Sequence, residues 1–216
     1  MFSLLVMKKY TKENSRIMHE IGHFIFFTLY LSSKSNFEKS MFCYNVYGIS
    51  IVPDKDDNSF GRVTIDSKIL KKSKTGCYFM LLSGVLCDLL LIDHTIEKKF
   101  DKVKDIRKNF IDIYNDLGGE SDLLQLIKNF VKRSTFDKVA VYIYELRKQI
   151  YKLWDQEVIR SITRKLYRKL QKDKEIYSEG CYKIIEPYIP ELKKLGKQVY
   201  GPKTKLSVYA KIILFQ

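Results

Sequence analysis

Residues 17–31 read IMHEIGHFIFFTLYL, and this stretch decides how the rest of the sequence is interpreted. It contains one residue that disfavours a helix, Gly22, and nearly every position after the second histidine is apolar. A segment of this length that is apolar on almost all faces is typical of a helix buried inside a domain. We therefore expect a buried helix that begins at Lys12 or Ser15 and ends at Leu31.

This helix carries two of the three histidines of the chain, in the pattern His19-Glu20-Ile21-Gly22-His23. Because histidine is so scarce, an HExxH pattern would arise by chance in about one such chain in several hundred. Residues four apart lie on one face of a helix, so both imidazoles can bind one metal ion while Glu20 acts on a water molecule. The pattern predicts a metal site. Zinc is favoured, although manganese, cobalt and iron accept the same ligand types.

A catalytic zinc site needs a third protein ligand, which the HExxH pattern does not name. The metzincin pattern is excluded, because Phe26 and Leu29 stand where that class has its glycine and histidine. Among the candidates, Asp122 follows two glycines at the start of an expected helix, where the chain can turn sharply. An aspartate there is also common as a helix cap. The candidate third ligands are Glu38, Asp88, His94, Glu97 and Asp122.

Beyond the first helix, the sequence predicts a small hairpin and then mostly helices, an α+β fold that is mostly α. Pro187 and Pro190 should kink or split the last helix. The extended stretches are 42–52 and 60–65, with a turn at 53–58, and the helical segments are 75–92, 95–117, 121–132, 135–174 and 182–198. We divide the chain into a chemical core (1–133), a helical extension packed on it (134–200) and a C-terminal arm (201–216), which can form a strand.

The chain is basic, with 39 Lys and Arg against 25 Asp and Glu among its 216 residues and a net charge of +14. A net positive charge of this size is typical of proteins that bind nucleic acid or an anionic membrane surface. However, the lysines are spread along the whole chain, and we interpret the basic segment 160–174 as the solvated face of a helix. We therefore do not expect nucleic acid to be the partner.

The sequence shows no transmembrane segment and no export signal. The longest apolar run, 77–92, includes an aspartate and is shorter than the roughly 20 residues that cross a bilayer. The four cysteines form no CxxC pair, as expected for reduced thiols in a cytosolic protein. We expect a cytoplasmic location, and the sequence is compatible with a homo-oligomer.

Four stretches, taken in order, resemble the peptidase domain of the FtsH family of AAA zinc proteases. The resemblance covers about residues 14–133. In place of the family's apolar GGRAAEE helix the chain has Asp88 for the first glutamate and Leu89 for the second, and residues 93–117 resemble an inserted helix. The stretches are HEIGH, similar to HEAGH; GISIVP with FGRVT, similar to a strand ending in IIP followed by LGxT; LSGVLCD at 82–88; and GGESDL at 118–123, similar to GASNDL.

The resemblance implies a zincin-like helical peptidase domain and a zinc-dependent metalloendopeptidase. It makes His19 and His23 zinc ligands, Asp122 the third ligand and Glu20 the general base, which passes its proton on to the leaving amine. His94 is a candidate second stabiliser of the oxyanion. A polypeptide substrate would pair with the exposed edge of one of the two extended stretches. Because the AAA module of that family is not part of this sequence, we expect cleavage of flexible segments, a separate ATPase or unfoldase, or one particular partner.

Two other interpretations stay open. An ImmA-like regulatory peptidase also carries an HExGH helix, and Glu38 or Glu97 on the metal would favour it. A protein of another class would bind nucleic acid through the basic segment 160–174 and would keep the metal site as a structural or decayed feature.

Overall fold

The computed structural model of the protein describes residues 11–53, 61–66, 68–69, 74–88, 102–106 and 136–208. These residues are mostly helical and include a small antiparallel sheet, which confirms the α+β, mostly α fold class. The principal elements are α1 (Lys12–Ser32), α2 (Lys39–Asn45), β1 (Val46–Ser50), β2 (Arg62–Ile65), α4 (Lys74–Asp88), α8 (Phe136–Trp154), α9 (Glu157–Asp173), β3 (Glu175–Tyr177), α10 (Ser178–Ile185), the 3-10 turn η3 (Glu186–Tyr188) and α11 (Ile189–Tyr200).

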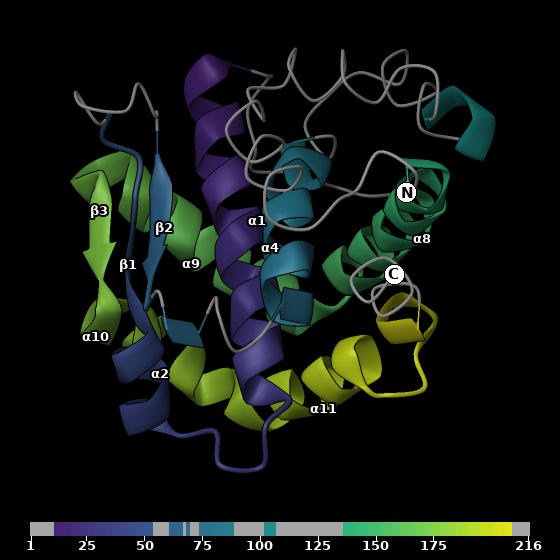
Figure 1. Ribbon diagram of the computed structural model, residues 1–216. Coiled ribbons are helices and arrows are strands. Elements are labelled where there is room, and N and C mark those ends of the chain that lie inside the picture. Colours follow the sequence, from purple (N-terminus) through teal and green to yellow (C-terminus); the bar gives the residue numbers. More distant parts are fainter. Residues whose placement is uncertain are drawn as a thin grey trace.

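Helix α1 lies in the middle of the molecule, with the sheet on one side and α4 and α8 on the other (Figure 1). It begins where the Thr11 hydroxyl accepts a hydrogen bond from the Asn14 N–H, at 3.1 Å. It ends where the Ser33 N–H binds the Leu29 carbonyl at 3.0 Å, in the polar stretch after the apolar run. The expected buried first helix is therefore confirmed, with its apolar side chains almost completely excluded from solvent.

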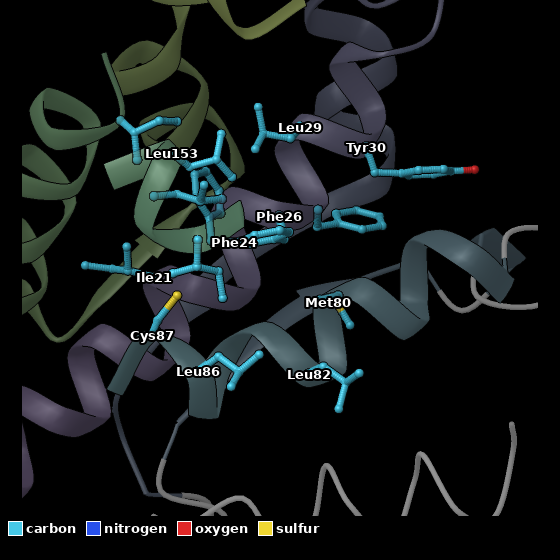
Figure 2. Close-up of a cluster of buried hydrophobic side chains, with 14 of the residues drawn as sticks. Ile21, Phe24, Phe26, Leu29, Tyr30, Met80, Leu82, Leu86, Cys87 and Leu153 are labelled. Atoms are coloured by element: carbon cyan, nitrogen blue, oxygen red, sulfur yellow. The ribbon is translucent and has the colours of Figure 1, made fainter. Parts of the chain in front are cut away.

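Helices α1 and α4 pack closely because Gly22 has no side chain. A Cβ at Gly22 would lie 2.7 Å from the Cys87 sulfur and 2.8 Å from the Ser83 carbonyl oxygen, which is too close for any larger residue. The Ser83 hydroxyl donates a hydrogen bond to the Gly22 carbonyl at 3.2 Å. Figure 2 shows the buried side chains of α1, such as Ile21, beside Cys87 and Leu86 of α4. This packing holds α4 against the part of α1 that carries the HExxH pattern.

The described residues form a three-stranded sheet in the order β2-β1-β3, and β1 is antiparallel to both neighbours. Ile49 of β1 pairs with Val63 and with Ile176, and Ile49 and Ile176 are buried. The hairpin expected from the sequence is therefore present as β1 and β2. Because β1 is paired on both sides, it is not an edge strand, whereas β2 has a strand partner on one side only among the residues that the structure describes.

The prediction that residues 42–52 are extended is wrong for their first part, since α2 extends through Asn45. The side chain of Phe42 is buried and packs against Phe24, Phe37 and Tyr182, with ring centroids 5.7–6.4 Å apart. This tertiary burial outweighs the preference of aromatic residues for strands, which depends strongly on context.

The C-terminal half of the chain supplies strand β3, which the sequence did not predict. The expected helical segment 135–174 is interrupted at Asp155 and Gln156 and therefore forms two helices, α8 and α9. Lys174 ends α9 in the left-handed region, with φ of 66°. Its carbonyl accepts a hydrogen bond from the Ile51 N–H at 2.9 Å, which joins the turn before β3 to the end of β1.

The expected split of the last helix is confirmed, because η3 separates α10 from α11 at the two prolines. Helix α11 packs on the end of α1, where Ser32 donates a hydrogen bond to the Leu192 carbonyl at 2.9 Å. In the tail, residues 205–208 are helical rather than extended. The expected helix 121–132 and most of 95–117 lie outside the described residues, so a division of the chain at residue 133 stays a prediction. Within the described ranges, no helix combines the length and apolar character needed to cross a bilayer.

Candidate metal centre

The two histidines of the motif lie on successive turns of α1, and their rings meet edge to face, with centroids 4.6 Å apart. Gly84 of α4 lies opposite them. A Cβ at Gly84 would be 2.5 Å from Nε2 of His23 and 2.7 Å from Nε2 of His19. The two Nε2 atoms therefore face the same small space beside α4, as the spacing of the motif predicts.

The other nitrogen of each ring has a hydrogen-bond partner in α4. Nδ1 of His23 lies 2.6 Å from the Met80 carbonyl oxygen. Because a carbonyl only accepts, this Nδ1 carries the hydrogen, and the neutral ring then presents a lone pair at Nε2. Nδ1 of His19 lies 2.9 Å from Oδ2 of Asp88. Metal-binding histidines almost always have a carbonyl or a carboxylate at their second nitrogen, and this pair has one of each.

Asp88, the last residue of α4, is completely buried. Burial raises the pKa of the Asp88 carboxyl, and the facing His19 imidazole opposes this rise. The carboxylate contacts the Nδ1 side of His19, whereas the Nε2 side faces Gly84. The structure thus places this candidate third ligand behind His19 and not in the space that both Nε2 atoms share.

Glu20 belongs to α1, and its side chain contacts Gly61, the residue that precedes β2. A Cβ at Gly61 would be 2.8 Å from Oε1 of Glu20, so the backbone at Gly61 lies directly over the carboxylate. The residue is 5% exposed, and His23 is 6% exposed. The site is therefore recessed, and the N-terminal end of β2 lies next to its carboxylate.

The remaining candidate ligands do not gather at this site in the described part of the chain. Glu38 is exposed at the start of α2, where it accepts a hydrogen bond from the Ser40 hydroxyl at 2.5 Å. Asp122, His94 and Glu97 lie outside the described residues, so the assignment of Asp122 stays a prediction. Among residues 11–53, 61–66, 68–69, 74–88, 102–106 and 136–208, no three His, Cys, Asp or Glu side chains are placed to hold a metal ion together.

Three backbone features of the site were not singled out from the sequence: Gly84, Gly61 and the Met80 carbonyl. Of these three, Gly84 could have been recognised from the sequence. A glycine inside a helix is less favourable than alanine by about 1 kcal/mol, so Gly84 in the apolar stretch LLSGVLCD points to a close approach by another group. The contact of the Met80 carbonyl could not have been recognised from the sequence, because every residue has a main-chain carbonyl.

The site offers two imidazole nitrogens that face one space and a buried carboxylate on the same helix. Imidazole nitrogens suit zinc and several other transition metals. A carboxylate next to such a site is suited to accept and return a proton. No family model, no curated protein and no solved structure matches this chain.

Proposed function

We propose that the protein is a zinc-dependent metalloendopeptidase that hydrolyses peptide bonds in flexible protein segments. One observation carries this proposal: the Nε2 atoms of His19 and His23 face the same space beside Gly84, while both Nδ1 atoms are held by partners in α4. If the two rings served only to fill space in the packing, their Nε2 atoms would not have to face the same space.

The residues present fit zinc. His19 and His23 would supply two nitrogen ligands, which zinc accepts readily. Asp122 would be the third ligand, as the resemblance to the FtsH peptidase domain implies, and a zincin-like fold follows from the same resemblance. The positions of the described residues are compatible with this set, because Asp88 stands behind His19 and does not itself occupy the shared space.

Glu20 would be the general base and general acid. When bound, zinc would polarise the scissile carbonyl and increase the acidity of water. Glu20 would take the proton of the attacking water and then deliver it to the leaving amine nitrogen. Its carboxylate belongs to the same helix, α1, as both histidines and is covered by Gly61. This cover keeps the group away from bulk solvent.

The substrate would be an extended segment of polypeptide. A recessed site is reached more easily by an extended strand than by the surface of a folded protein, and strand addition binds main chain without requiring one sequence. Strand β2 is suited to this role, since it begins one residue after Gly61, which contacts Glu20. Since β1 is central in the sheet, we assign the role to β2 alone.

Removal of the metal tests this function. We expect the purified protein to cleave an unfolded polypeptide such as denatured casein, and a strong zinc chelator to stop the cleavage. Adding zinc back in stoichiometric amount should restore the rate, because zinc is needed for the chemistry and the fold persists without it. The controls are the far-ultraviolet circular dichroism spectrum, which should be unchanged by chelation, and a serine-protease inhibitor, which should have no effect. Cleavage that continues at full rate after complete zinc removal would contradict the proposal.

A further inference from the structure

The Asp88 carboxylate has a role that the candidate metal site does not by itself explain. We propose that Asp88 is a positioning residue, which orients His19 for zinc without binding the zinc itself; this rests on the proposed zinc site. The observation behind it is the contact of 2.9 Å between Oδ2 of Asp88 and Nδ1 of His19, from the end of one helix to the middle of another.

The geometry of the ring separates the two roles. Nδ1 and Nε2 lie on different sides of the imidazole, and Nε2 of His19 faces Gly84 together with Nε2 of His23. The oxygen that accepts the hydrogen bond from Nδ1 is therefore on the side away from the shared space. Asp88 can fix the ring and increase the basicity of Nε2, as carboxylates behind metal-binding histidines do.

Energetics also argue against a purely structural role. Asp88 is completely buried, and its carboxylate contacts Nδ1 of His19. Burying a carboxylate costs free energy, and a neutral residue of the same shape that keeps the hydrogen bond to Nδ1 avoids this cost. A buried carboxylate at this position is therefore not explained by stability. It is explained if the carboxylate orients the His19 ring and increases the basicity of its Nε2 atom.

The two histidines differ in how they are held. His23 is oriented by the main-chain carbonyl of Met80, which no substitution removes. His19 is oriented by a side chain, so its partner can be changed alone. Asn at position 88 keeps the shape of the residue and can still accept a hydrogen bond from Nδ1, but it removes the negative charge.

The test compares wild type with Asp88→Asn by three measurements on the full chain. Zinc affinity, measured by competition with a chromophoric chelator, should fall about 10- to 100-fold. The visible absorption bands of the Co²⁺-substituted protein should keep their wavelengths, because the set of ligands does not change. The melting temperature of the metal-free protein should be equal to or higher than that of wild type. The matched control is Asp66→Asn, the same change at a buried aspartate that follows β2 and accepts a hydrogen bond from the Lys68 N–H, and it should leave zinc affinity unchanged.

Zinc affinity of Asp88→Asn within twofold of wild type would refute the positioning role while leaving the proposed function intact. Altered Co²⁺ bands would show that Asp88 is itself a ligand and would also overturn the proposal. A lower melting temperature with unchanged affinity would assign Asp88 a structural role. If wild type binds no zinc, the proposed function itself fails, and the role of Asp88 fails with it.

Discussion

Replacing Glu20 with glutamine is expected to reduce peptide hydrolysis by about 10²- to 10⁴-fold, the range that a general base contributes. Glutamine has nearly the same shape, so the buried position beside Gly61 should accept it without loss of folding. Since Glu20 is not assigned as a zinc ligand, zinc content should remain at the wild-type level. The measurements are the rate of cleavage of an unfolded substrate and the zinc content of the same preparation.

Glu13→Gln is the matched control for this variant. Glu13 is a glutamate of the same helix, but it is exposed and pairs with Lys174 at 2.6 Å. Its replacement should leave cleavage at the wild-type rate. Hydrolysis by Glu20→Gln at the rate of Glu13→Gln would show that Glu20 is not the base, and loss of zinc from Glu20→Gln would show that Glu20 acts at the metal.

Replacing Gly84 with alanine is expected to abolish zinc binding, although the change adds one methyl group. The new Cβ would lie within 2.7 Å of Nε2 of both histidines, so the rings would have to move out of their common orientation. Overpacking of this kind costs about 1–3 kcal/mol of stability, and the better helix propensity of alanine returns only about 1 kcal/mol. Zinc content and thermal unfolding of the metal-free protein measure the two effects.

A double variant separates the clash from other effects of the methyl group. Gly84→Ala combined with His23→Ala should be more stable than Gly84→Ala alone, because it removes the nearer of the two clashing rings and leaves only that of His19 to move. Gly180→Ala is the control, since a Cβ at this glycine of α10 would meet a methyl group of Ile176 at 3.0 Å and the Cε atom of Lys169 at 4.0 Å, both in side chains. It should keep its zinc. Full zinc content in Gly84→Ala would mean that the two rings do not bind metal through the space beside α4.

The helix that carries the site could be predicted almost completely from the sequence. The polar stretch after the apolar run placed its end at Leu31, one residue before the observed Ser32, and of the two expected beginnings, Lys12 and Ser15, the structure has Lys12. Helix geometry alone places His19 and His23 on one face, whereas the common direction of their Nε2 atoms also depends on the Nδ1 partners in α4. The last helix was also predictable, because proline cannot continue a helix and its effect is local.

The parts that could not be predicted depend on contacts between segments far apart in the chain. Phe42 lies in a helix because it is buried beside three other aromatic rings, one of which comes from α10. Strand β3 is three residues long, too short for a periodic pattern, and exists because it pairs with β1. Asp88 could be recognised as a candidate ligand, but only the packing of α4 on α1 shows that it contacts Nδ1 of His19.

Zinc analysis of wild type, His23→Ala and Asp122→Ala, purified in parallel, tests most directly whether α1 and a distant carboxylate hold a metal ion. Wild type should contain about one zinc ion per chain, and both variants should lose most of it, because each lacks one of three protein ligands. Asp173→Ala, which removes an exposed carboxylate paired with Lys169, should retain the wild-type amount. Equal metal content in all four proteins would contradict the assignment of the ligands and, with it, the proposed hydrolase.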